Sequence, residues 1–315
     1  MNLLNIFIET LNATIPVFAM VLLGVALKYL KWIDHSFINT ASKLVFRGAL
    51  PTLIFLSIID ADLTTALIPG LMIYFALATL IAFLISWAWA VKRIDRADRG
   101  VYVQGAFRGN GSILGLALAG TMYGDYGLSV GGILASVLIP LYNILAVIVL
   151  SSYQPGKRAS WQSIVRNIIT NPLIIAVVAA LLFSSLGLQL PTWLHTSGRY
   201  FANVTMPLAL ICIGGTLSMT AIRESSSTAL GASWIKIFWL PLLATAGAWL
   251  VGFRDAQLGL LFVYFSSPSA ASSFVMAQAM GGNAKLAANI IAITTVGSSL
   301  TVTAGVFLLQ LIGTT

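Results

Sequence analysis

The sequence predicts an all-α polytopic membrane protein with ten transmembrane helices in two inverted five-helix repeats. Three observations lead to this prediction: a composition suited to lipid, apolar segments of spanning length, and an internal repeat. Of the 315 residues, 58% are hydrophobic and only 8% are charged, whereas soluble domains carry about 25% charged residues. A mean hydropathy of +0.95 indicates that nearly the whole chain lies in the lipid bilayer.

Ten apolar segments have roughly the 20 residues that a helix needs to cross the hydrocarbon core. We place them at 5–30, 37–59, 66–91, 100–123, 126–151, 164–186, 193–219, 227–252, 256–280 and 285–312. The first segment has no positive n-region and is long enough to span, so we expect a membrane helix and not a cleaved signal peptide.

Basic residues predict the orientation of these spans. The connections that follow odd-numbered spans carry most of them: Lys28, Lys31, Lys43, Lys92, Arg93, Arg96, Arg99, Lys157, Arg158, Arg166, Arg223 and Lys285. The opposite side has Arg254 and, near a span end, Arg199. Because short cytoplasmic loops collect lysine and arginine, we expect both termini on the outer, periplasmic side.

An internal repeat divides the chain into residues 1–153 and 164–315. Pro16 in the first span matches Pro172 in the sixth, 156 positions later. Pro51 in the second span matches Pro207 in the seventh at the same spacing, and the ends of the fourth and ninth spans correspond at a spacing of 158. Each repeat holds five spans, an odd number, so the two halves must insert with opposite orientation, as in many secondary carriers.

The strongest functional signal is an arginine inside the fourth span. Arg108 opens the run Arg108-Gly109-Asn110-Gly111-Ser112, at a depth where a charge costs roughly 3 kcal/mol or more on insertion scales. The glycines loosen the helix and make backbone groups available as ligands. A buried cation beside interrupted backbone is suited to holding an anion within the membrane.

The repeat spacing aligns this interruption with a second one in the ninth span, Ser267-Pro268-Ser269. Paired Gly/Pro interruptions in corresponding spans point to the midplane site of a carrier. We therefore expect helices 4 and 9 to be broken, to cross, and to aim half-helix N-termini at a bound anion. The candidate substrate-binding residues are Arg108, Gly109, Asn110, Gly111, Ser112, Ser267, Pro268, Ser269, Ser272 and Gln278.

Each of these candidates also has a structural interpretation. Arg108 lies about 13 Å along the helix from the cytoplasmic end, so its side chain could reach back to water. Asn110 could form an interhelical hydrogen bond. Ser267 and Ser269, next to a proline, could satisfy freed carbonyls, and small residues such as Ser272 could simply let helices approach.

Composition also argues against several other classes of function. With one cysteine, Cys212, a cysteine-rich metal site is excluded, and we expect no metal and no cofactor. There is no Walker-type run for ATP, and neither histidine lies at mid-span depth, so we expect neither a pump nor an intramembrane hydrolase. A receptor would normally add a soluble signalling domain, and the sequence shows no such segment, so we do not expect a receptor. The basic loop residues serve topology and do not indicate nucleic-acid binding.

Several motifs together resemble the auxin efflux carrier family. They are Gly24-x-x-x-Lys28, Ala41-Ser42-Lys43-Leu44-Val45-Phe46, Pro207-Leu208-Ala209-Leu210, Gly214-Gly215-Thr216-Leu217, Ser267-Pro268-Ser269-Ala270-Ala271 and Ala277-Gln278-Ala279-Met280-Gly281-Gly282. The resemblance covers the whole chain, and the family includes plant auxin exporters and bacterial carriers of malonate, malate and related carboxylates. This sequence departs from the family at the fourth-span interruption, which lacks the usual proline.

The resemblance implies an architecture like that of sodium/proton antiporters and bile-acid symporters. Helices 1, 2, 6 and 7 would form a scaffold that dimerises, and helices 3–5 and 8–10 a transport unit that moves as an elevator. It also implies a bacterial inner-membrane protein similar to malonate and other organic-acid permeases. The expected function is secondary transport of a small organic anion such as malonate, malate or an auxin-like acid.

The coupling ion is open at this point. No Asp or Glu lies at the centre of a span, which argues against cation antiport. Coupling to H⁺, coupling to Na⁺ through carbonyls and hydroxyls, and uniport all remain. The closest alternative function is a sodium-coupled symporter of the bile-acid type.

Overall fold

The computed structural model describes residues 3–60, 68–153, 169–170, 172–217 and 226–311. Within these ranges all regular secondary structure is helical, which confirms the predicted all-α class. Five stretches among them are long and apolar enough to cross a membrane: His35–Asp60, Pro69–Arg93, Gly111–Tyr153, Ser227–Val251 and Ala284–Leu311. The chain is therefore a polytopic membrane protein. The loop residues Lys157, Arg158, Arg166 and Arg223 lie outside the described residues.

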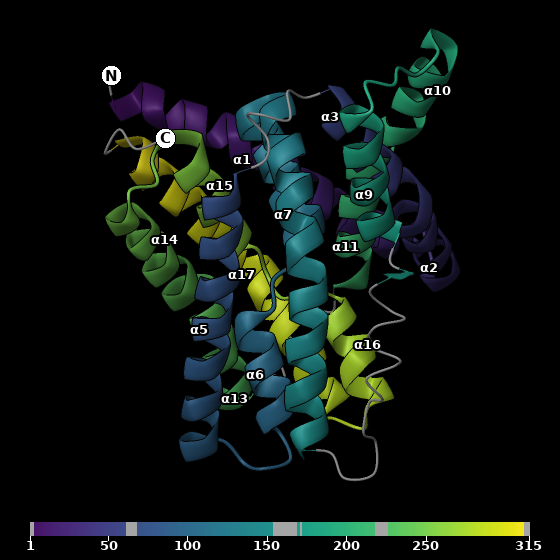
Figure 1. Cartoon of the computed structure of the whole chain (residues 1–315). Coiled ribbons are helices and arrows are strands. Elements are labelled where there is room, and N and C mark those ends of the chain that lie inside the picture. Colours follow the sequence, from purple (N-terminus) through teal and green to yellow (C-terminus); the bar gives the residue numbers. More distant parts are fainter. Residues whose placement is uncertain (1–2, 61–67, 154–168, 171, 218–225, 312–315) are drawn as a thin grey trace.

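One group of helices contains the N-terminal helix and its main partner, α11. It consists of α1 (Leu3–Tyr29), α2 (His35–Leu44), the π-helical turn η1 (Val45–Ala49), α3 (Leu50–Asp60), α9 (Pro172–Ser185), α10 (Thr192–Asn203) and α11 (Thr205–Thr216). In Figure 1, α3 packs against α9 and α10, and α1 packs along α11. A Cβ on Gly214 would lie 1.9 Å from the Val21 carbonyl oxygen, so α11 and α1 touch backbone to backbone.

The second group of helices holds most of the remaining chain. It consists of α5 (Pro69–Arg93), α6 (Arg99–Phe107), η2 (Gly111–Gly115), α7 (Leu116–Tyr153), α13 (Ser227–Trp234), η3 (Ile235–Trp239), α14 (Leu240–Val251), α15 (Asp255–Ser266), α16 (Ser272–Ala279) and α17 (Ala284–Leu311). Here α5 and α7 pack on α6, α14 packs on α15, and α13 packs on α17. Phe75 of α5 stacks on Phe265 of α15 at 4.7 Å between ring centroids, which joins the first and second halves of the chain.

Local sequence explains where several helices begin. The Asp34 carboxylate accepts the Phe37 N–H at 2.7 Å and caps α2. The Ser226 hydroxyl caps α13 in the same way, and Pro69 stands at the first position of α5. Ser, Asp and an early Pro are the residues that favour helix N-termini, because they satisfy or remove the unpaired N–H groups there.

The chain reverses direction inside α7. In a straight helix, residues eight apart lie about 12 Å from each other, but a Cβ on Gly127 would lie 2.1 Å from the Ala119 carbonyl oxygen. The reversal occurs at Gly124, whose φ of 57° is accessible to glycine and strained for other residues. Residues on the two sides of Gly124 therefore fold back against each other.

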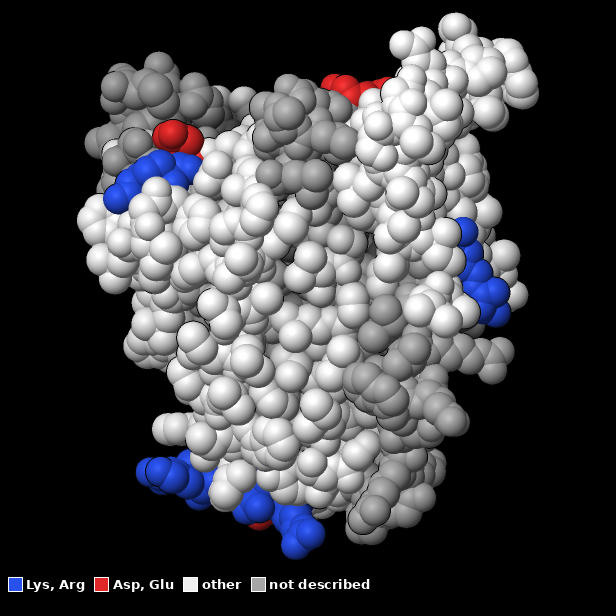
Figure 2. All heavy atoms as spheres, viewed as in Figure 1, with Lys and Arg blue, Asp and Glu red and all other residues white. Residues whose placement is uncertain are grey.

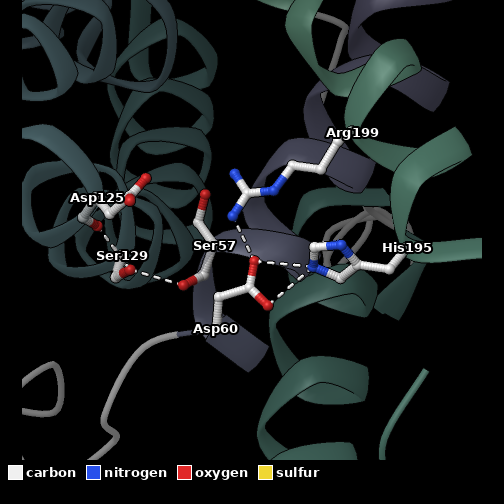
Figure 3. Close-up of polar contacts among 6 residues, drawn as sticks. All are labelled: Ser57, Asp60, Asp125, Ser129, His195 and Arg199. Carbon is white, nitrogen blue, oxygen red and sulfur yellow. Dashed lines mark hydrogen bonds and ion pairs between the residues drawn. The ribbon is translucent and has the colours of Figure 1, made fainter. Parts of the chain in front are cut away.

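Polar contacts hold the chain together at the end of α3 (Figure 3). The Asp60 carboxylate lies between His195 and Arg199 of α10, with His195 Nε2 at 3.0 Å from Asp60 Oδ1. Beside it, the Ser129 hydroxyl of α7 donates to the Ser57 carbonyl oxygen at 2.7 Å. The first contact lies within the first helix group, whereas the second joins the two groups.

On the face shown in Figure 2, most charged side chains lie near the two ends of the molecule. Figure 2 shows lysine and arginine side chains clustered at the end that holds the α5–α6 connection in Figure 1. On the face shown, most of the surface between the ends is uncharged, apart from one Lys/Arg patch about halfway up the right edge. The start of α1 and the end of α17 lie together at the opposite end from the α5–α6 connection.

Candidate functional site

The two predicted interruptions meet in the middle of the second helix group. α6 ends at Phe107 and α15 ends at Ser266, and each is followed by a few extended residues. These short segments pair in an antiparallel bridge between Gly109 and Ser269. The Asn110 N–H donates to the Pro268 carbonyl oxygen at 2.7 Å, so the two residues aligned by the repeat are in direct contact.

Ser267 and Ser269 stabilise this crossover through hydrogen bonds within the protein. Both residues are buried. The Ser269 hydroxyl donates to the Gly105 carbonyl at 2.6 Å, and its N–H donates to the Thr294 hydroxyl of α17 at 3.0 Å. The Ser267 hydroxyl donates to the Val263 carbonyl at 2.7 Å. Their polar groups are thus used within the protein, which matches the structural interpretation of these serines.

A cavity of about 310 Å³ lies in front of the crossover. One wall comes from the first helix group: Ser42, Val45, Phe46, Ala209, Cys212, Ile213 and Thr216 of α2, η1 and α11. The other wall comes from the second group: Arg108, Gly109, Asn110, Ser112, Ile113, Leu138, Ile139, Tyr142, Asn143, Ala270, Ala271 and Ser272. The cavity therefore lies at the boundary between the two helix groups.

Arg108 is the charged group of this cavity. Its guanidinium donates to Asn143 Oδ1 at 2.8 Å, to Ser272 Oγ at 3.0 Å and to Met276 Sδ at 2.7 Å. Its Nε has no hydrogen-bond partner, and the residue is only 6% exposed. All three partners are neutral, and no carboxylate in the described ranges forms an ion pair with Arg108. A buried charge of this kind is unfavourable without a counter-ion.

Two helix N-termini open onto the same cavity. The helix that continues as α7 begins at Gly111, with Ser112 and Ile113 in the cavity wall, and α16 begins at Ser272. The first N–H groups of a helix lack intrahelical acceptors and carry a partial positive charge, which favours anions. With Arg108 between them, the cavity presents positive potential from three directions.

The structure separates the predicted site residues into two sets. Arg108, Gly109, Asn110, Ser112 and Ser272 line the cavity. The remaining predicted residues do not line it: Gly111, Ser267, Pro268, Ser269 and Gln278. The four from the interruptions build the crossover, and Gln278 is exposed near the end of α16.

Sequence reasoning missed three polar residues near the crossover. Asn143 and Tyr142 of α7 line the cavity, but they carry no charge and lie in a part of α7 that stays helical despite Pro140. Lys236 of η3 is fully buried and donates to the Phe265 carbonyl at 2.6 Å. A single lysine inside an apolar span is the same signal that identified Arg108, so Lys236 could have been found from the sequence.

A larger hollow of about 780 Å³ lies between α5 and the α13–α14 helix pair. Its wall is almost entirely aliphatic and aromatic, including Leu77, Ile81, Trp89, Trp234 and Leu243. Such a lining offers neither charge nor helix N-termini to an anion. The smaller cavity is therefore the better candidate functional site, because a binding site needs convergent polar groups.

The chain matches a known protein family over nearly its full length. The profile of a family described as "Membrane transport protein" matches residues 10–163 and 154–305. A protein named "Uncharacterized transporter" from Methanothermobacter thermautotrophicus is 28% identical over 279 residues, which are 86% of this chain and 89% of that protein. The "Uncharacterized transporter YfdV" of Escherichia coli K12 is 23% identical over 88% of this chain and 92% of its own length.

These matches agree with the polytopic helical fold of a membrane protein. They point to a transporter and not to an enzyme. The motifs from Gly24 to Gly282 that resemble the auxin efflux carriers all lie within the matched residues. This membrane transporter is thus a member of the auxin efflux carrier family.

Proposed function

We propose that this protein is a secondary transporter of small organic anions and that the 310 Å³ cavity is its substrate site. The observation that carries the proposal is Arg108, a buried guanidinium in the cavity wall whose described partners are all neutral. A substrate carboxylate would supply the missing counter-ion. Hydrogen bonds between a guanidinium and a carboxylate are strong where water is excluded.

The remaining cavity groups would orient the substrate. The Asn110 and Ser112 side chains and the N–H groups at the start of the Gly111 helix would bind one carboxylate end. Ser272, at the start of α16, would bind from the other broken helix. Gly111, Ser267, Pro268 and Ser269 would act through the shape of the crossover and not by direct contact.

The size of the cavity favours a small substrate. Its volume of about 310 Å³ is at the lower end of the roughly 300–1,000 Å³ typical of ligand pockets. A dicarboxylate such as malonate or malate suits this volume and the positive potential better than a steroid-sized anion does. The bile-acid-type symporter is therefore the weaker alternative.

The arrangement of the helices supports an elevator mechanism. We propose ten transmembrane helices in two inverted repeats, with the first helix group as scaffold and the second as transport unit. Most of the proposed substrate-binding residues belong to the second helix group, while α2, η1 and α11 of the first helix group form the opposite wall of the cavity. Movement of the second group along the first would carry the substrate across the membrane.

Topology and assembly complete the proposal. The basic α5–α6 end would face the cytoplasm, because basic loops are retained there. Both termini would then face the periplasm of a bacterial inner membrane. The scaffold groups of two copies would form a homodimer, as the family resemblance implies.

Uptake of labelled malonate and malate into proteoliposomes tests the proposed function. Arg108→Ala removes the counter-charge, and we expect saturable uptake to be lost. Arg108→Lys keeps the charge without the planar, multiple-donor geometry, so partial uptake with a raised KM is expected. Arg93→Ala is the matched control, because Arg93 is exposed at the end of α5.

A binding measurement separates affinity from movement. Malonate should raise the melting temperature of the purified wild type and of Arg93→Ala, and should leave that of Arg108→Ala unchanged. Undiminished uptake and stabilisation in a folded Arg108→Ala variant would show that Arg108 has only a structural role and would refute the site.

A further inference from the structure

Lys236 is a second buried cation, and the proposed anion site does not use it. The residue is 0% exposed and lies in η3, in the middle of the membrane-length stretch Ser227–Val251. It is absent from the wall of the 310 Å³ cavity. An ionisable side chain at this depth is costly and usually has a functional reason. π-helical turns such as η3 are also frequent at functional sites.

The ammonium of Lys236 lies where two half-helices end. It donates to the carbonyl oxygen of Phe265, in the last turn of α15, at 2.6 Å. A Cβ on Gly109, just past the end of α6, would lie 3.0 Å from Lys236 Nζ and 3.4 Å from the Ser267 carbonyl oxygen. Helix C-termini present unpaired carbonyls and a partial negative charge, so the ammonium compensates the end of α15 and lies beside the segment that follows the end of α6.

Gly109 separates the two buried cations. It lines the anion cavity, and it also leaves the space that the Lys236 ammonium occupies. Arg108 thus faces the cavity, where two helices begin. Lys236 lies on the other side of Gly109, at the C-terminal end of α15. No carboxylate from the described residues forms an ion pair with Lys236.

Carriers with broken helices hold their coupling cation at this kind of position, using unwound carbonyls and half-helix C-terminal ends. Here a covalently attached ammonium already binds the Phe265 carbonyl. We propose that Lys236 takes the place of a coupling cation at the crossover, so that transport by this protein does not require Na⁺. The inference rests on the proposed anion transport and specifies how that transport is coupled.

Two substitutions of Lys236 test this inference. Lys236→Ser removes the charge, leaves space at the carbonyls and adds a hydroxyl ligand, so that a small cation can enter. Lys236→Met removes the charge but fills the space. In proteoliposomes loaded and bathed with equal salt, wild-type uptake of labelled malonate should be the same in Na⁺ and in choline.

The two variants should then differ in their response to Na⁺. Uptake by Lys236→Ser should fall at least about tenfold in choline, since a buried helix-end charge is lost, and should recover in Na⁺. Lys236→Met should stay inactive in both salts. Lys92→Ser and Lys92→Met, at the exposed end of α5, are the matched controls and should behave like the wild type.

A readout without substrate keeps this inference separate from the proposed function. At constant ionic strength, Na⁺ in place of choline should raise the melting temperature of Lys236→Ser alone, whether or not malonate is a substrate. Malonate stabilisation that is lost in Arg108→Ala reports on the anion site instead. Na⁺-dependent uptake or Na⁺ stabilisation of the wild type overturns the inference, and so does a folded Lys236→Ser that does not respond to Na⁺.

Discussion

The contact between Arg108 and Asn143 sets the net charge of the proposed site, because Asn143 is a neutral partner of the guanidinium. Asn143 Oδ1 accepts from the Arg108 guanidinium at 2.8 Å. Asn143→Asp would change this neutral partner into a carboxylate of the same shape, and Arg108 would gain a permanent counter-ion. We expect malonate stabilisation and uptake to be lost while thermal stability rises, because a buried unpaired charge becomes paired.

Asn203→Asp is the control for this change, because it adds the same charge at the exposed end of α10. Asn143→Ala is informative as well, since it removes a hydrogen bond and adds no charge, and should weaken malonate binding only moderately. If Asn143→Asp still bound malonate like the wild type, Arg108 would not be the anion-binding group.

The residues of the site differ in how predictable they are. Arg108 could be predicted because a charge in an apolar span is costly, and Asn110 because the repeat aligns it with Pro268. Asn143 could not be predicted, because a single neutral amide within an apolar helix gives no sign of the direction it faces. Ser267 and Ser269 show the converse, since their position was predicted and only the structure shows which carbonyls their hydroxyls bind.

At the scale of elements, the crossover and the cavity can be tested independently of each other. The buried Ser269 hydroxyl satisfies the Gly105 carbonyl, so Ser269→Ala leaves that carbonyl without its partner, at a cost of about 1–3 kcal/mol. We expect a lower melting temperature and a nearly unchanged malonate affinity. Ser272→Ala should weaken malonate binding and leave the melting temperature nearly unchanged, because Ser272 lines the cavity.

Thermal unfolding and malonate titration of both purified variants check this contrast. Ser299→Ala is a suitable control, because Ser299 is only partly buried on α17 and its hydroxyl donates to its own helix, at the Val296 carbonyl. A Ser269→Ala variant of normal stability with weakened malonate binding would move Ser269 into the substrate site.

The helices themselves were more predictable than their details. Apolar segment length located α5 and α17 to within a few residues, because a span of fixed thickness fixes the helix length. The π-helical turns η1, η2 and η3 were not predicted, since each depends on packing between distant helices and has no local sequence signature. The crossover was predicted because both interruptions contain residues that favour broken helices.

For the whole molecule, the elevator requires α7 to slide along α3. These helices touch where a Cβ on Gly132 would lie 3.7 Å from the Ile54 Cβ, close to the roughly 3.8 Å separation found in disulfides. Ile54→Cys with Gly132→Cys, in a Cys212→Ser background that removes the one native thiol, should therefore form a cross-link between the two helix groups.

We expect oxidation of this double variant to abolish malonate uptake and a reductant to restore it, because the bond fixes the transport unit at one position on the scaffold. Malonate stabilisation should persist in the oxidised protein, since the cavity itself is unchanged. Mass spectrometry confirms the bond, and Ile54→Cys alone is the control that should ignore the oxidant. Full uptake by the cross-linked protein would show that α3 and α7 do not slide past each other, and transport would then have to occur by local gating around a fixed cavity.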